Sequence, residues 1–166
     1  SLDLSLEKQH KKKIFNILKN LILNLEKKNN PFYSFSRNFK LNFKISNLNK
    51  FKKFNTVAII GMGGSSLGIE AIYNFLNVKI KKEFIFFNDL DQTKLNELRK
   101  KNLNKILFLV ISKSGETLET YANFFSLPIL KKKNNNIIII CEKSNNTLYM
   151  FAKKYDLLHI EHRKYI

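Results

Sequence analysis

Two short stretches rich in glycine and serine carry the residue types best suited to bind a small anion. The first is Ile60-Gly61-Met62-Gly63-Gly64-Ser65-Ser66-Leu67-Gly68, and the second is Ser112-Lys113-Ser114-Gly115-Glu116-Thr117. Together they contain all five glycines of the 166-residue chain. Glycine lets the backbone approach a ligand without a Cβ in the way, and amides left free at a helix N-terminus bind phosphate groups. The pattern therefore predicts a phosphate site built by two turns.

Hydroxyl groups are concentrated in the second stretch. Ser112, Ser114 and Thr117 lie within six residues of one another, beside Gly115. One alternative is that these residues only cap the following helix, since Ser and Thr are favoured N-caps. A cap needs a single hydroxyl, so three of them next to a glycine favour an anion site. Lys113 could add positive charge to that site or simply face solvent.

Other known site patterns fit the chain less well. The third glycine of the dinucleotide fingerprint falls three residues after the second, a spacing that the first stretch lacks, and neither stretch continues into the Gly-Lys-Ser/Thr of a P-loop. His159 and His162 are potential metal ligands, but on a strand their side chains would point to opposite faces. We expect no metal site. Cys141 follows an apolar run and is interpreted as a small buried hydrophobe rather than a reactive thiol.

Alternating apolar runs and helical patterns must position the two turns. The predicted strands are Val57–Ile60, Phe84–Phe87, Ile106–Ile111, Ile137–Cys141 and Leu157–Ile160. The predicted helices between them run at about Leu67–Leu76, at about Gln92–Lys101, from about Thr117 with a kink at Pro128, and at Asn146–Tyr155. Continuous apolar strands separated by helices indicate an α/β fold, a three-layer sandwich with a five-stranded parallel sheet covered on both faces. Ligands bind at the carboxyl ends of such strands, which is where both turns fall.

Helical periodicity also predicts which residues face the core. We expect the inner faces to hold Ala71, Ile72, Phe75 and Leu76 in the first of these helices, and Leu118, Tyr121, Ala122 and Phe125 in the third. Before the sheet, an amphipathic helix is predicted from about Leu4 to Lys28, followed by an aromatic loop with a possible short helix at Asn47–Lys53. The expected organisation is a region of residues 1–54 packed on the core of a domain of residues 55–166.

Composition narrows the class of protein. The net charge is +17 and the isoelectric point is near 9.9, but the lysines are scattered along helix faces and turns, with arginine only at Arg37, Arg99 and Arg163. Without a basic stripe interleaved with aromatic residues, no nucleic-acid partner is expected. No apolar run approaches the ~20 residues of a membrane span, no signal peptide is evident, and the lone cysteine suits a reducing compartment. We expect a soluble cytoplasmic protein without a membrane partner.

The two stretches resemble the two signatures of the glucose-6-phosphate isomerase (phosphoglucose isomerase) family. Residues 60–68 are similar to the first signature, and Ser-Lys-Ser-Gly-Glu-Thr-Leu-Glu-Thr at 112–120 is similar to the second, in the family's order and at a similar separation. The resemblance implies a flavodoxin-like sugar isomerase domain. In the complete enzyme it implies interconversion of glucose 6-phosphate and fructose 6-phosphate in glycolysis and gluconeogenesis. A sugar-phosphate ligand, a homodimer and no cofactor are also implied.

The resemblance assigns roles to residues of both turns. It implies that Gly64 and Ser65, with Gly63 beside them, line the sugar site. It implies that the phosphate is surrounded by Ser112, Lys113, Ser114, Gly115 and Thr117. Glu119 matches a family glutamate that faces the sugar ring, and it is the candidate catalytic residue of this chain.

Two departures from the family pattern stand out. Glu116 occupies a position where the family usually has threonine, and the form Ser-x-Ser-Gly-Glu-Thr is common in amino-sugar members of the wider superfamily. Because a carboxylate aimed at a phosphate would be repelled, we expect Glu116 to point outward. The family's proton-transferring glutamate, its catalytic histidine and lysine, and its Gly-Gly-Arg segment lie further along the chain than any residue present.

We therefore expect the N-terminal half of an isomerase that by itself lacks the catalytic residues. Two alternatives of another class stay open at this point. One is a non-catalytic domain of the same type that senses a sugar phosphate or binds an amino-sugar phosphate. The other is a basic RNA-associated protein.

Overall fold

The computed structural model of the chain describes residues 4–28, 30–129 and 135–163. The chain divides into two compact units between Leu41 and Asn42. The organisation expected from the sequence, with residues 1–54 packed on a domain of residues 55–166, stays a prediction.

The first unit contains helix α1 (Leu4–Leu25) and the 3-10 helix η1 (Pro31–Phe35). The predicted N-terminal helix is confirmed, and it ends three residues before Lys28. Beyond it, the Glu26 carboxylate accepts hydrogen bonds from the Ser36 hydroxyl at 2.9 Å and the Asn38 side-chain amide at 2.6 Å. These bonds hold the segment after η1 against the end of the helix.

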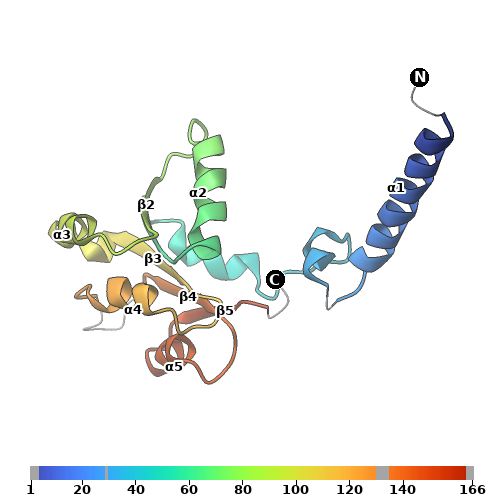
Figure 1. Cartoon of the computed structure of the whole chain (residues 1–166). Coiled ribbons are helices and arrows are strands. Elements are labelled where there is room, and N and C mark those ends of the chain that lie inside the picture. The colour runs from blue at the N-terminus through green and yellow to red at the C-terminus, as the bar shows by residue number, and fades with distance from the viewer. Residues whose placement is uncertain (1–3, 29, 130–134, 164–166) are drawn as a thin grey trace. The chain divides into compact units, whose positions relative to one another are not determined.

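The second unit is built on a five-stranded parallel sheet with the order β2-β1-β3-β4-β5 (Figure 1). Its strands are β1 (Thr56–Ile60), β2 (Glu83–Phe87), β3 (Ile106–Ile111), β4 (Ile137–Cys141) and β5 (Leu158–Glu161). Each lies within one residue of its predicted range, and every neighbouring pair is parallel. The predicted α/β class and parallel sheet are confirmed.

Helices cover both faces of this sheet, as predicted. They are α2 (Gly64–Leu76), α3 (Gln92–Lys100), α4 (Leu118–Phe125) and α5 (Thr147–Lys154), with the 3-10 helices η2 (Ile45–Phe51) and η3 (Leu103–Lys105). Crossovers between parallel strands are right-handed, and β1 leads to β2 in one direction while the later crossovers run in the other. For that reason α2 lies on one face and α3, α4 and α5 lie on the opposite face (Figure 1).

Each face of the sheet has its own apolar cluster. On the side of α3, α4 and α5, the fully buried side chains include Phe87, Phe108 and Phe124. On the side of α2, Phe51 and Phe54 pack over alternate residues of the strands. The strands are apolar on both faces because both faces are covered, which is why they read as continuous apolar runs in the sequence.

The predicted inner face of α2 is wrong at three of its four positions, and Leu76 is half-buried. Ala71 is exposed, and Ile72 and Phe75 are 61% and 87% exposed. The helix instead turns Ser66, Ile69 and Tyr73 toward the sheet, with the Tyr73 ring centroid 4.8 Å from that of Phe84. The sequence pattern misled because one of the residues that face the sheet is the small polar Ser66, which is fully buried.

The predicted inner face of α4 is also wrong in part. Leu118 is 75% exposed, Ala122 is exposed and Phe125 is 39% exposed, although Tyr121 is partly buried against the core. The buried residues of α4 are Thr120, Asn123 and Phe124, and Leu127 just beyond the helix is buried as well. Their spacing of three and four residues is regular, but two of the four are polar, so hydropathy alone selects the wrong face.

The predicted kink at Pro128 does not form. Helix α4 ends at Phe125, so the proline lies beyond it. Proline disfavours helical backbone at the residue before it, which suits a helix that has already stopped. Among the described residues, no helix is both long enough and apolar enough to cross a bilayer.

Candidate functional site

The two glycine turns lie side by side at the carboxyl edge of the sheet. Ile60 of β1 pairs with Val110 of β3, so Gly61 comes next to Ile111. A Cβ added at Gly61 would lie 2.8 Å from the Ile111 carbonyl oxygen. In a sheet of this order the chain leaves β1 and β3 in opposite directions, and this switch point is where such folds bind ligands.

The first turn joins β1 to α2. The Gly61 amide donates to the Phe87 carbonyl at 3.1 Å, which holds the turn against the end of β2. Gly63 is the N-cap of α2 and has a φ of 53°, a backbone conformation in which any side chain would be strained. Gly64 is exposed and Ser65 is half-buried. The turn thus presents backbone and one small side chain at the edge of the sheet.

The second turn is held by its own hydroxyl groups. Ser112 is 1% exposed, and its Oγ lies 2.8 Å from Thr117 Oγ1 and accepts from the Gly115 amide at 3.2 Å. Ser114 Oγ accepts from the Glu116 amide at 3.2 Å. Thr117 is the N-cap residue of α4, yet its side chain makes no capping hydrogen bond. Capping therefore does not account for the Thr117 hydroxyl.

The amides at the start of α4 are not used by the helix itself. The bond from the Tyr121 amide to the Thr117 carbonyl, 3.1 Å long, is the first of the helix, and the amides of residues 118–120 precede it. The positive end of the helix dipole lies at the same place. Lys113 and Ser114 are exposed beside it, and Glu119 is half-buried on the first helical turn. This arrangement can stabilise an anion.

Glu116 is exposed and reaches the start of α5. Its carboxylate accepts from the Thr147 amide at 2.8 Å and from the Tyr121 hydroxyl at 2.9 Å. The Thr147 amide, followed by the Tyr121 hydroxyl, lowers the pKa of this carboxyl below its ordinary value. Glu116 is exposed, as expected, and its carboxylate is bound by the Thr147 amide at the start of α5.

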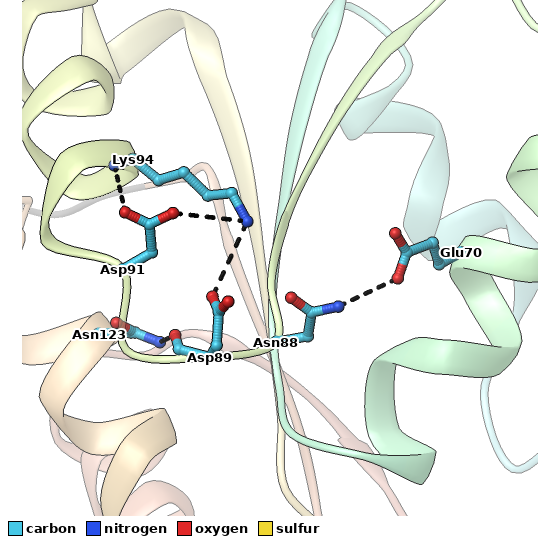
Figure 2. Close-up of polar contacts among 6 residues, drawn as sticks. All are labelled: Glu70, Asn88, Asp89, Asp91, Lys94 and Asn123. Atoms are coloured by element: carbon cyan, nitrogen blue, oxygen red, sulfur yellow. Dashed lines mark hydrogen bonds and ion pairs between the residues drawn. The ribbon is translucent and has the colours of Figure 1, made fainter.

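A loop after β2 borders the first turn. Figure 2 shows that the Asn88 side chain donates to Glu70 Oε2 of α2 at 3.1 Å, while the Asn123 side chain of α4 donates to the Asp89 carbonyl at 2.7 Å. The Asp91 carboxylate accepts from the Lys94 amide at 3.0 Å and so caps α3. The loop is thereby tied to both helices that follow the glycine turns.

Asn123 and Asn146 are the supporting residues that sequence reasoning missed. Asn146 is 4% exposed and is the N-cap of α5, where its Oδ1 accepts from the Tyr149 amide at 2.8 Å. An N-cap asparagine before a helical pattern was a usable signal for Asn146. Asn123 gave no signal, because only its burial against the loop after β2 marks it out.

The residues set aside by the sequence analysis stay outside the site. His159 Nε2 lies 3.0 Å from the Cys141 carbonyl oxygen, and His162 Nδ1 lies 3.1 Å from the Arg163 carbonyl oxygen. No group of three potential metal ligands occurs in the part of the chain that the structure describes. Cys141 is fully buried, and burial raises its pKa to about 11, which confirms that it is a core residue.

The sequence pattern of the phosphoglucose isomerase family matches residues 4–145, a range that includes both turns. The chain belongs to this family. Glucose-6-phosphate isomerase of Borreliella afzelii is 35% identical over 122 residues, covering 69% of this chain and 22% of that protein. A probable glucose-6-phosphate isomerase of Methanococcus maripaludis is 34% identical over 128 residues, covering 71% of this chain and 29% of that protein.

Solved structures agree on the fold. The crystal structure of a hypothetical protein from Thermus thermophilus matches with a TM-score of 0.62 and 22% identity, covering 68% of this chain and 29% of that one. The chain spans less than a third of the length of the curated relatives that it matches.

Proposed function

We propose that this chain is the sugar-phosphate-binding part of a glucose-6-phosphate isomerase. The observation that carries the proposal is the position of the two glycine turns, side by side at the switch point of the sheet. One of them ends in a helix whose first amides have no partner within the helix. The family membership supplies the substrate class.

The second turn is the proposed phosphate anchor. Its backbone amides and the hydroxyls of Ser112, Ser114 and Thr117 bind the phosphate oxygens, Gly115 keeps the turn open, and Lys113 adds positive charge. Support comes from Thr117, whose hydroxyl makes no cap and lies 2.8 Å from the Ser112 hydroxyl. Only one of the two hydroxyls donates in their shared hydrogen bond, so the other keeps a proton that it can donate to an incoming oxygen anion.

The first turn is the proposed sugar contact. Gly63, Gly64 and Ser65 bring backbone close to the sugar, and Glu119 on the first turn of α4 faces its ring. In aldose–ketose isomerisation a carboxylate base takes the proton from C2 and returns a proton to C1 through an enediol, so the anchored phosphate fixes the geometry of the transfer. We place the proton-transferring base in the part of the longer enzyme that follows this chain. The complete enzyme is proposed to be a cytoplasmic homodimer.

Titration followed by NMR tests the anchor. With glucose 6-phosphate, or more weakly inorganic phosphate, the amides of residues 114–117 should shift first, because they surround the proposed site. Glucosamine 6-phosphate in a parallel titration tests the amino-sugar alternative, and tighter binding of that ligand would favour it. If the largest shifts map to Lys11–Lys13 instead, general attraction to a strongly basic chain is the better explanation and the proposal fails.

A threonine pair separates the anchor from general effects. Thr117→Val keeps the side-chain volume but removes a hydroxyl that would bind the charged ligand, so sugar-phosphate binding should weaken by about 1.5 to 3 kcal/mol. Thr93→Val, at an exposed position of α3, is the matched control and should bind like wild type. Equal affinity of both variants would remove Thr117 from the site.

A further inference from the structure

The Ser112–Thr117 turn, which is the proposed phosphate turn, is held on its carbonyl side by the Glu142–Thr147 loop that follows β4. The Glu142 amide donates to the Lys113 carbonyl at 2.9 Å, and the Leu148 amide lies 3.4 Å from the Gly115 carbonyl. The Tyr121 hydroxyl shares its single proton between the Gly115 carbonyl and the Glu116 carboxylate. With the Lys113 and Gly115 carbonyls bonded on this side, the turn can offer a ligand on the other side those amides that it does not bond internally.

Asn146 is the centre of the Glu142–Thr147 loop. Its side-chain amide donates to the Glu142 carbonyl at 2.8 Å and to the Ser144 hydroxyl at 2.9 Å, while its Oδ1 accepts from the Tyr149 amide at 2.8 Å. The side chain therefore does more than cap α5, because it also sets the shape of the segment that bonds Lys113.

Gly115 rests directly on the Asn146 side chain. Its φ is +69°, and a Cβ added there would collide with the Asn146 Oδ1 and Cγ atoms. Asn146 is 4% exposed, so its amide fills the space beneath the turn. Contact with this buried side chain from another loop constrains the Gly115 backbone, together with its bonds to Ser112, Tyr121 and Leu148.

We propose that Asn146 is the positioning residue of the phosphate turn: through Gly115 and the Glu142 amide it holds the turn's amides in the geometry that binds phosphate. This inference rests on the proposed function, since it names the residue that organises the same site. Asn146 itself does not touch the ligand. Its effect is on affinity, through the conformation of the Ser112–Thr117 turn.

Serine at this position separates positioning from capping. Asn146→Ser retains an N-cap hydroxyl, so the melting temperature should fall little, but the shorter side chain loses the contact with Gly115 and the bond to the Glu142 carbonyl. Affinity for inorganic phosphate should then fall about tenfold, the size expected when one hydrogen bond to a charged ligand is lost. The Gly115 amide resonance should also move before any phosphate is added.

Two further variants keep the experiment decisive. Asn102→Ser makes the same change at the N-cap of η3, which lies before β3 and so at the opposite edge of the sheet, and it should leave phosphate affinity unchanged. Asn146→Asp keeps the shape of the side chain if the serine variant does not fold. It removes the donor to Glu142 and adds a negative charge, so it should weaken phosphate binding by at least as much.

The outcomes distinguish the two proposals. A tenfold loss in Asn146→Ser or Asn146→Asp, with wild-type affinity in Asn102→Ser, supports Asn146 as the positioning residue. Wild-type affinity in the folded Asn146 variants overturns that role and leaves the proposed function intact. A wild-type chain that binds no phosphate overturns both.

Discussion

At the scale of single residues, the glycines of the two turns differ in what they would tolerate. Gly115 has positive φ and lies against the Asn146 side chain, whereas Gly68 sits in the interior of α2 with open space where a Cβ would be. The same substitution should therefore have opposite effects at the two positions.

Gly115→Ala should destabilise the chain and Gly68→Ala should stabilise it. The first combines about 1–2 kcal/mol for a left-handed alanine with about 1–3 kcal/mol for the overlap with Asn146. The second gains about 0.5–1 kcal/mol of helix propensity. Urea unfolding of both variants measures the difference, and a Gly115→Ala protein as stable as wild type would mean that Asn146 does not support the turn.

The thiol of Cys141 gives a prediction on pH. Burial raises its pKa from 9.0 to about 11, so the folded state favours the neutral thiol. Its contribution to stability is complete below pH 9 and is lost as the pH rises through about 11. At pH 8, iodoacetamide should not alkylate the folded chain, yet it should react readily in urea. Rapid alkylation of the folded chain would show that β4 opens to solvent.

At the scale of elements, the orientation of the helices is the point on which sequence and structure differ. Leu118 fits an apolar helical stripe in the sequence but is 75% exposed, whereas Leu98 of α3 is 1% exposed. Helix α4 starts from a turn held by the Ser112 and Thr117 hydroxyls, so hydropathy is not the only influence on its orientation.

A leucine pair tests this orientation. Leu98→Ala should lower the free energy of unfolding by about 2 to 5 kcal/mol, as large-to-small changes in a core do. Leu118→Ala should change it by less than about 0.5 kcal/mol, as at exposed positions. Thermal or urea unfolding of the two variants is sufficient. A large loss in Leu118→Ala would indicate that α4 buries the face predicted from hydropathy.

At the scale of the whole molecule, the chain carries the proposed anchor without a proposed proton-transferring base. Glu119 is the carboxylate that we propose, from the family resemblance, to face the substrate. General base catalysis contributes about 10² to 10⁴-fold and needs the base within hydrogen-bond reach of the proton.

We therefore expect no measurable glucose-6-phosphate isomerase turnover from these 166 residues. A coupled assay that converts fructose 6-phosphate and detects glucose 6-phosphate measures it, with a full-length family enzyme as the positive control. Turnover by this chain that is abolished by Glu119→Gln would contradict the expectation and make Glu119 the base.

The sequence by itself determined the strands, the parallel sheet and the place of both glycine turns. Those features follow from local patterns, because a strand buried on both faces must be continuously apolar and a turn with positive φ calls for glycine. The clustered hydroxyls of Ser112, Ser114 and Thr117 are also a local pattern, so they could be identified without a structure.

Only the tertiary structure decided which faces of α2 and α4 are buried and what supports the phosphate turn. Ser66, Thr120 and Asn123 are buried although they are polar, so hydropathy could not orient their helices. The bond between Glu116 and the Thr147 amide joins residues 31 positions apart. The contact between Gly115 and Asn146 joins the same two segments, the Ser112–Thr117 turn and the Glu142–Thr147 loop. Contacts between residues so far apart in the chain depend on β3 and β4 lying side by side. Nothing in the local sequence of either segment encodes that pairing.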